Sequence, residues 1–282
     1  MKFETIEFEL RENGIGILTL NRPEHFNAIS SQMVLDLHKI FNHLLINLDC
    51  RVVILKGSGK HFCAGLDLKE SGLLSSKTVP EELKKKYFFL DTSEILKTQI
   101  YFQEYLSQII LKMRKISQPI IALIHGAAAG GGFAFALAAD IRYASKDAKF
   151  NNAFIKIGLS GSDVGTSYFL PRLIGLSRAS EILNTGRFIN SFEAERIGFV
   201  SKVVENRELF QKGLEIADQL LLKSPIGLRL TKQAINLSMD APSLELMTQL
   251  ENRNQDITST SKDIIEGISS FFEKRDPNYP LK

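Results

Sequence analysis

The sequence is poor in cysteine and has no large excess of either charge. Its two cysteines, Cys50 and Cys63, cannot build a disulfide framework, so a reducing, cytoplasmic compartment is expected. Lys and Arg total 35 against 32 for Asp and Glu, and this net charge of +3 gives no support to nucleic acid or a membrane surface as a partner. The N-terminal residues also lack the basic and then apolar layout of a signal peptide.

One stretch is apolar enough to be mistaken for a membrane span. Residues 120–139 contain no acid, Lys or Arg, and twenty such residues are long enough to cross a bilayer. His125 and the successive glycines at residues 130–132 argue against one continuous helix, since each glycine costs about 1 kcal/mol of helix stability. A buried strand, a glycine turn and a buried helix over residues 133–139 explain the stretch better, so no membrane span is expected.

Hydrophobic patterning predicts an α/β protein. Strands are expected at residues 6–10, 15–20, 52–55, 120–124, 141–144 and 199–204. Asn13-Gly14 joins the first two as a hairpin turn, and helical spacing dominates after Pro171. We therefore expect an α/β core over residues 1–200 and a C-terminal helical region over residues 201–282.

Neither a metal site nor a nucleophilic site is indicated. The five histidines are scattered and have no partners at metal-ligand spacing. The serines around Gly161 lack the flanking glycines of a hydrolase nucleophile elbow, and no nearby histidine offers a base. Cys63 lies in a glycine-containing loop but is expected to be a small packing thiol.

Two glycine-containing turns remain, at residues 62–70 and 130–132, and each follows a predicted buried strand. Glycine lets a backbone approach a ligand closely, and the first amides of a helix are unpaired donors carrying about half a positive charge. Neither turn has the glycine spacing of a dinucleotide-binding fingerprint. The two turns are therefore candidates for binding a ligand through main-chain groups.

Together with their surroundings, these turns resemble the enoyl-CoA hydratase/isomerase (crotonase) superfamily. The matching segments are Asn21-Arg22-Pro23 with Asn27-Ala28, residues 62–70, 120–141, 158–175, 179–186 and 194–198, and Glu266-Gly267 with residues 271–275. The resemblance implies an α/β, crotonase-like spiral of strand-strand-helix units with a C-terminal helical trimerisation region. It further implies an acyl-CoA thioester substrate, no separate cofactor because coenzyme A is part of that substrate, and a homotrimer or hexamer.

The resemblance also implies which main-chain groups act in catalysis. In the family, two backbone N–H groups hold the thioester oxygen and stabilise an enolate. In this sequence they are the N–H groups of Leu66 and Gly131. Such donors act where negative charge develops, and the loss of one costs about 2.7–4 kcal/mol. Because the donors belong to the backbone, the apolar side chain of Leu66 is no obstacle.

A set of coenzyme A contacts follows from the same resemblance. These residues are Arg22, Ala28, Ala64, Asp67, Leu68 and Lys274. The loop around Leu66 would hold the adenine through main-chain groups, and the two basic side chains would meet the phosphates. Lys274 would do so from a neighbouring subunit. Ordinary solvated charge explains Arg22 and Lys274 equally well.

The acids depart from those of the family's hydratases, which use two glutamates to add water. The first would fall after the glycines, where Gly132-Phe133-Ala134 offers no acid, and the second would fall near Phe154, again with no acid. Asp163 remains, in a Ser-Asp-Val-Gly-Thr segment similar to the loop of dienoyl-CoA isomerases, but with one more residue between the preceding glycine and the aspartate. Its carboxylate either moves a proton beside the thioester, with a pKa raised by burial, or caps the helix beginning near Thr166.

A single acid suits a double-bond shift, because the proton removed from one carbon can return to another. Isomerisation is therefore favoured over hydration. Two alternatives stay open: hydration by Asp163 with Ser160, Ser162 or Tyr168 as a polar partner, and an acyl-CoA-binding homologue without catalysis. An insertion at residues 72–98 either walls the acyl pocket or packs against the next helix, so acyl length cannot be deduced.

Overall fold

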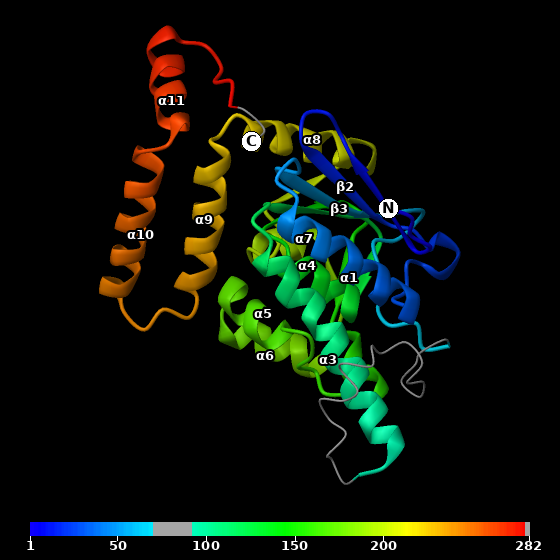
Figure 1. The fold of residues 1–282 in the computed structure, drawn as a ribbon. Helices are drawn as coiled ribbons and strands as arrows, with labels where there is room; N and C mark the ends of the chain where they lie inside the picture. The colour runs from blue at the N-terminus through cyan, green and yellow to red at the C-terminus, as the bar shows by residue number, and fades with distance from the viewer. Residues whose placement is uncertain (70–91, 280–282) are drawn as a thin grey trace.

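The computed structural model describes residues 1–69 and 92–279, and within them a mostly parallel sheet of six strands forms the centre (Figure 1). Across the sheet the strands are β1 (Ile6–Leu10), β2 (Ile15–Leu20), β3 (Val52–Gly57), β4 (Ile120–Ile124), β6 (Ile141–Ser145) and β9 (Lys202–Val204). β1 and β2 form the predicted antiparallel hairpin, and the later neighbours pair in parallel. The predicted strands are confirmed, although the last one begins only at Lys202.

A smaller sheet of three strands lies next to the glycine turns. Its strands are β5 (Ala127–Ala129), β7 (Lys149–Asn151) and β8 (Ile189–Asn190). The helices and 3-10 turns are η1 (Pro23–His25), α1 (Ser31–Ile46), α3 (Glu94–Lys115), α4 (Gly131–Ala138), η4 (Ala153–Ile157), α5 (Thr166–Ile174), α6 (Leu176–Thr185), α7 (Ser191–Arg196), α8 (Asn206–Leu221), α9 (Pro225–Ser238), α10 (Leu244–Ser259) and α11 (Lys262–Glu273). Most of the insertion expected at residues 72–98 lies outside the described residues.

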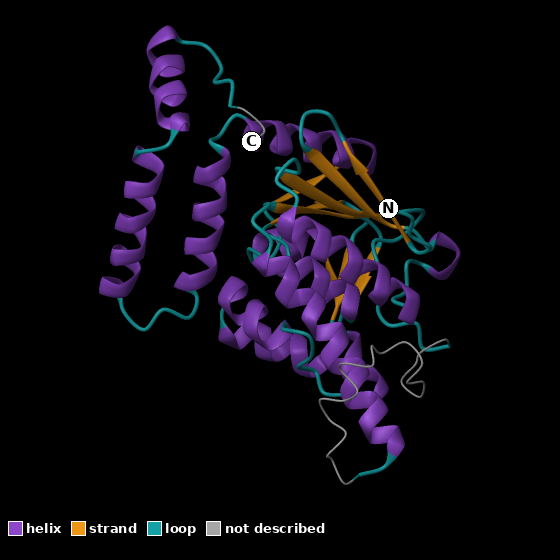
Figure 2. Ribbon diagram, viewed as in Figure 1, coloured by secondary structure: helices purple, strands orange, loops and turns teal. Residues whose placement is uncertain are grey.

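Alternation along the strands divides their side chains between two hydrophobic cores. On β3, Val53 and Leu55 belong to the core built with α1, α3 and α4. Val52 and Ile54 belong to a second core, on which α8 packs. Helices therefore lie on both faces of the sheet (Figure 2). Burial on both faces is the reason the parallel strands consist of continuous apolar runs.

The apolar stretch at residues 120–139 folds as a strand, a glycine turn and a helix, as predicted. β4 comes first, β5 follows, and α4 begins at Gly131, before the residue 133 start that we expected. The helix starts early because its first turn packs against the main chain of Cys63: a Cβ on Gly132 would lie 2.2 Å from the Cys63 carbonyl oxygen. In the described part of the chain, no helix is both long and apolar enough to cross a membrane.

The last three helices, α9 to α11, extend from the core as an arm (Figure 1). β9 and α8 also follow residue 200, yet β9 pairs with β6 and α8 packs on the central sheet. The C-terminal helical region is thus present, while its boundary at residue 200 and its role in trimer formation stay predictions.

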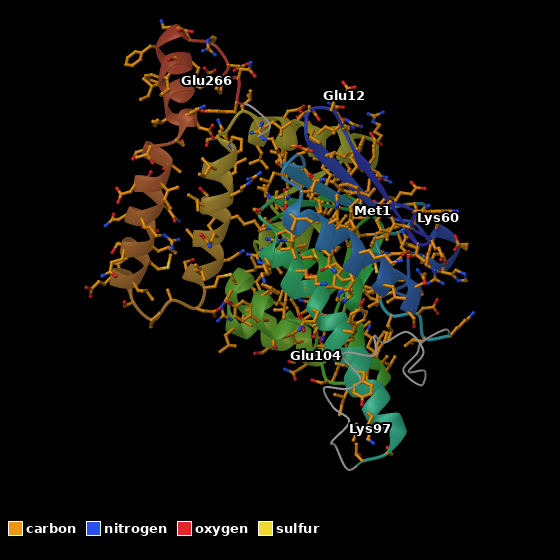
Figure 3. All side chains as sticks on the ribbon, in the orientation of Figure 1. Met1, Glu12, Lys60, Lys97, Glu104 and Glu266 are labelled. Carbon is orange, nitrogen blue, oxygen red and sulfur yellow. The ribbon has the colours of Figure 1, made fainter. Side chains whose placement is uncertain are left out.

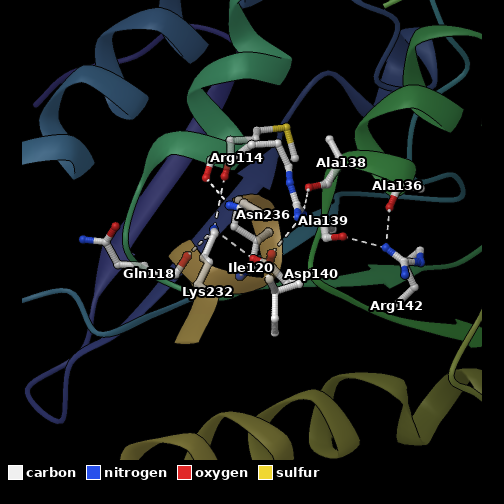
Figure 4. A network of polar contacts seen from close by, with 12 residues as sticks. Arg114, Gln118, Ile120, Ala136, Ala138, Ala139, Asp140, Arg142, Lys232 and Asn236 are labelled. Carbon is white, nitrogen blue, oxygen red and sulfur yellow. Dashed lines mark hydrogen bonds and ion pairs between the residues drawn. The ribbon is translucent and has the colours of Figure 1, made fainter. Parts of the chain in front are cut away.

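A buried polar joint fastens the arm to the core (Figure 4). Lys232 of α9 is 5% exposed; its Nζ lies 2.9 Å from Asp140 Oδ2 and donates to the carbonyl oxygens of Met113 and Gln118. Asp140 also pairs with Arg114 at 2.9 Å and accepts a hydrogen bond from the Ile120 N–H. An ion pair removed from water is stable only when further hydrogen bonds satisfy its remaining atoms, and this joint supplies them.

A second buried polar cluster joins α1 to α3. The His38 ring is stacked on the Tyr105 ring at 3.7 Å, its Nε2 lies 2.7 Å from the Tyr105 carbonyl oxygen, and its Nδ1 lies 2.7 Å from Lys112 Nζ. Because an ammonium group can only donate, Nδ1 accepts and Nε2 carries the proton. Burial, together with the nearby Lys112 charge, lowers the pKa of His38 to about 4.

This cluster predicts a loss of stability in mild acid. An unfolded histidine has a pKa of about 6.5, so the unfolded chain binds a proton at His38 over a pH range in which the folded chain does not. The free energy of unfolding therefore keeps its full value above about pH 6.5 and decreases as the pH falls toward 4. The expected decrease is about 2 kcal/mol after a reduction for solvent screening. Urea unfolding from pH 7 to 4 should therefore show a steeper loss for the wild type than for His38→Gln. Equal pH slopes would contradict this assignment.

Candidate active site

The first glycine turn is held between two neighbouring segments. On one side, the Cys63 N–H donates to Ala127 O and Cys63 O accepts from the Ala129 N–H, both at 3.0 Å. On the other side, the Ile29 N–H donates to Gly65 O at 2.7 Å, and Ile29 O accepts from the Asp67 N–H at 3.0 Å. Gly65 allows the chain to turn between these contacts with φ +95°, a conformation that residues with a side chain rarely adopt.

These contacts fix the direction of the Leu66 N–H. The Gly65 carbonyl and the Leu66 N–H belong to the same planar, trans peptide group and point in opposite directions. Because the carbonyl points at the Ile29 N–H, the N–H of Leu66 points away from Ile29. Within residues 1–69 and 92–279, this N–H has no hydrogen-bond acceptor.

The second glycine turn places another unused donor close by. Gly131 is the first residue of α4, and Ala127 O, four residues earlier, already accepts from Cys63. The Gly131 N–H therefore also has no acceptor in the described part of the chain. A Cβ on Gly65 would lie 2.8 Å from Ala129 O and 3.6 Å from Gly131 N. The two turns thus contact each other so closely that only glycine fits at residue 65.

Most of the predicted coenzyme A contacts lie at the first glycine turn, whereas Lys274 lies in the arm. Ala64 donates from its N–H to Phe26 O, and the Ala28 carbonyl accepts from the Arg22 side chain, so both lie at the first turn. Leu68 is exposed beside them. Lys274 follows the end of α11, in the arm. Figure 3 shows Glu266 of α11 and Lys60, which precedes the first turn, on opposite sides of the molecule.

Two of the predicted contacts pair with each other. Arg22 Nη1 lies 3.0 Å from Asp67 Oδ2, and the two side chains are 11% and 9% exposed. Arg22 Nη1 also donates to Ala28 O at 2.7 Å. The alternative of an ordinary solvated charge is therefore wrong for Arg22, whose side chain is nearly buried. The roles of Arg22 and Asp67 toward coenzyme A stay predictions.

Phe133 and Phe154 lie in the two segments in which the resemblance would place the glutamates of the hydratases. Phe133 is fully buried, and its ring centroid lies 5.3 Å from that of Phe199. Phe154 is 7% exposed, and its ring lies 3.5 Å from the place that a Cβ on Gly130 would occupy. Neither ring can transfer a proton, and Phe154 lies directly against the second glycine turn.

Asp163 is held by its neighbours and does not cap α5. Its main-chain oxygen accepts from the Thr166 N–H at 2.9 Å, but the N-cap residue is Gly165 and no side chain accepts there. The predicted alternative of a carboxylate cap is therefore wrong. Instead, Oδ1 accepts from the Val164 N–H at 2.7 Å and from Gln103 Nε2 of α3. Within the described residues, Oδ2 accepts no hydrogen bond.

The surroundings of Asp163 have two features typical of a functional site. Burial raises the pKa of its carboxyl above the ordinary aspartate value, although the hydrogen bonds from Val164 and Gln103 act in the opposite direction. Val164 has φ +39°, which is strained for a β-branched residue, and such strain is concentrated at active sites and ligand clamps. Gln103 was not among the predicted site residues, since no local pattern marks one polar residue sixty positions from its partner.

The remaining candidate groups are inert or scattered. Cys63 is fully buried and burial raises the pKa of its thiol to about 12, in line with the predicted packing role. In the part of the chain that the structure describes, no group of three His, Cys, Asp or Glu side chains is arranged to hold a metal ion.

Comparison with known proteins decides the family. The family model for enoyl-CoA hydratase/isomerase matches residues 10–281. The chain belongs to this family. It is 37% identical over 264 residues to the probable enoyl-CoA hydratase EchA12 of Mycobacterium tuberculosis, covering 93% of this chain and 88% of that protein. It is 32% identical over 281 residues to the peroxisomal Delta(3,5)-Delta(2,4)-dienoyl-CoA isomerase of Arabidopsis thaliana, covering 98% and 97%.

The fold of this enoyl-CoA hydratase/isomerase family member also matches solved structures. A probable enoyl-CoA hydratase/isomerase from Mycobacterium abscessus superposes with a TM-score of 0.85 at 36% identity, covering 99% of this chain and 100% of that one. The predicted crotonase fold is therefore confirmed. The names of the relatives include both hydratases and isomerases, so family membership leaves the reaction of this chain open.

Proposed function

We propose that the chain is an isomerase that moves a carbon–carbon double bond in an acyl-CoA thioester. The N–H groups of Leu66 and Gly131 hold the thioester oxygen, and Asp163 transfers the proton. The observation that carries this proposal is that the two segments in which the resemblance places the hydratase glutamates, Gly132-Phe133-Ala134 and the residues around Phe154, contain no acid, while the N–H groups of Leu66 and Gly131 have no acceptor within the described residues.

In the proposed reaction, Asp163 removes a proton from the carbon beside the thioester carbonyl of a β,γ-enoyl-CoA. The C–H electron pair moves into the carbonyl, and the resulting dienolate carries its negative charge on the oxygen between the two N–H donors. The protonated carboxyl then returns the proton to the γ-carbon, which leaves the double bond conjugated with the carbonyl. No oxidant, reductant or water enters, so one acid is sufficient.

The position of the hydrogen bonds supports this role for Asp163. Both donors bind Oδ1, which leaves Oδ2 as the oxygen available to the substrate. A carboxyl whose pKa is raised by burial is also a stronger base once ionised. The reach of Asp163 to the substrate carbons is part of the proposal.

The proposal includes assembly of the family type, a homotrimer or hexamer. Apolar side chains along α11 support it, because Ile265, Phe271 and Phe272 are 67%, 78% and 77% exposed in the single chain. Exposed apolar surface of this kind is typical of an interface with another chain. In such an assembly Lys274 would approach the coenzyme A of a neighbouring subunit.

A cytoplasmic location also stays a prediction.

Purified enzyme given a β,γ-enoyl-CoA is expected to produce the conjugated α,β isomer. The ultraviolet absorbance of that isomer measures the rate. Given an α,β-enoyl-CoA, it is expected to add water only slowly, because no second acid activates the water. The similarity to proteins named enoyl-CoA hydratase favours hydration as the second candidate. Rapid water addition that survives Asp163→Asn would reject the isomerase proposal. Tight binding of both thioesters without turnover would instead identify a non-catalytic acyl-CoA-binding homologue.

A further inference from the structure

The Arg22–Asp67 pair joins the segment that follows β2 to the first glycine turn. Arg22 Nη1 contacts Asp67 Oδ2 at 3.0 Å and Ala28 O at 2.7 Å, and both side chains are almost removed from solvent. Two apolar residues of similar volume would often be as stable in such a place, and sometimes more stable. The presence of the pair therefore requires a reason other than stability.

The acidic partner directly follows the proposed donor. Leu66 lies between Gly65, whose carbonyl accepts from the Ile29 N–H, and Asp67, whose own N–H donates to Ile29 O. The first of these bonds sets the plane of the peptide that carries the Leu66 N–H. Anchoring the Asp67 side chain keeps both bonds in register and hence holds that N–H in one direction.

The basic partner is mounted on a rigid support. The Arg22 N–H donates to Asn27 Oδ1 at 2.9 Å, and Asn27 is fully buried. Asn27 Nδ2 in turn donates to the carbonyl oxygens of Ser58 and His61, at 2.8 and 2.7 Å. Asn27 also has φ +54°, a left-handed conformation that persists only where the surroundings fix it. Asn27 therefore anchors Arg22 to the segment that leads into the first turn.

We propose that the Arg22–Asp67 ion pair is a positioning device that aims the Leu66 N–H at the thioester oxygen. This inference rests on the proposed function. It differs from the phosphate contact implied by family resemblance, since a positioning role acts on the transition state whether or not the substrate carries the nucleotide part of coenzyme A.

The test uses two substrates, a β,γ-enoyl-CoA and the β,γ-enoyl-pantetheine thioester that lacks the nucleotide and its phosphates. The double variant Arg22→Met/Asp67→Leu removes both charges of this pair together, and Asp67→Asn serves as a milder variant. We expect the double variant to lose about 10²-fold in kcat on both substrates, with little change in KM, because misplacement of a reacting group by about 1 Å costs this much. Asp67→Asn should show a smaller loss of the same kind.

Lys212→Met is the matched control, because Lys212 forms an exposed pair with Glu215 on α8 and its loss should leave kcat unchanged. A loss restricted to the coenzyme A thioester would overturn the inference in favour of a phosphate contact, and an unchanged kcat in the double variant would also overturn it. If the wild type converts neither substrate, the proposed function fails. Hydrogen exchange in residues 63–67 then tests the positioning alone, with faster exchange expected in the double variant and equal exchange contradicting it.

Discussion

An enzyme with proline in place of Gly131 is expected to lose about 10²–10³-fold in kcat, because the substitution removes one of the two proposed donors to the thioester oxygen. Proline is well tolerated at the first position of a helix, and the Gly131 N–H makes no hydrogen bond within the described residues. The substitution therefore removes a donor without breaking α4.

The side chain that proline brings needs a control of its own. A Cβ on Gly131 would lie 2.5 Å from Ile29 Cδ1, so both variants should be made in an Ile29→Val background, which removes that atom. Gly131→Ala then adds the same Cβ but keeps the N–H, and should retain most of the activity. Steady-state kinetics of the two double variants isolate the donor. Equal kcat values would exclude the Gly131 N–H from the reaction.

Replacement of Asp163 by asparagine is expected to lower kcat for the double-bond shift by about 10²–10⁴-fold, the range for loss of a positioned acid–base group. The substitution is mild for the fold, because an amide oxygen can still accept from the Val164 N–H. Unfolding by urea should change little. Ser162→Ala, at an exposed neighbour, is the matched control and should keep the wild-type rate. An Asp163→Asn enzyme with normal activity would remove this residue from the mechanism.

The same carboxyl predicts the shape of the pH profile. As a base Asp163 must be ionised, so kcat/KM should fall as the pH drops through its pKa, which burial holds above the ordinary aspartate value. Gln103→Leu removes a hydrogen bond that lowers this pKa, so the acid limb should move to higher pH. In Asp163→Asn the residual activity should lose this limb. A limb unchanged by both substitutions would have to come from another group.

Much of the fold could be predicted because its signals are local. The apolar stretch at residues 120–139 contained its own strand, turn and helix, and only the start of α4 was placed too late. That error has a spatial cause, since Gly132 enters the helix to pack on Cys63, a residue distant in the chain. The residues at a strand end or a glycine turn indicate that feature themselves, whereas they do not indicate the distant residue against which it packs.

The candidate site shows the same division. The two glycine turns were found from the sequence and the structure brings them into contact, but their roles stay predictions until a ligand tests them. The pairing of Arg22 with Asp67 spans 45 positions and could not be predicted, because Arg22 was equally consistent with a solvated charge and nothing in the sequence links it to Asp67. The same holds for Gln103 and Asp163, which are 60 positions apart. Long-range polar pairs leave no periodic signal in a single sequence.

The Lys232 joint has a consequence for how this protein could be dissected. Asp140 receives one of its two cations from α9, and the same carboxylate holds the first N–H of β4 at the centre of the sheet. Severing the C-terminal arm would therefore leave Asp140 paired with Arg114 but without Lys232, and would remove the Lys232 donor from the carbonyl oxygens of Met113 and Gln118. Buried polar contacts connect the arm to the core, so the arm is a poor choice for exchange in chimaeras or for removal by truncation.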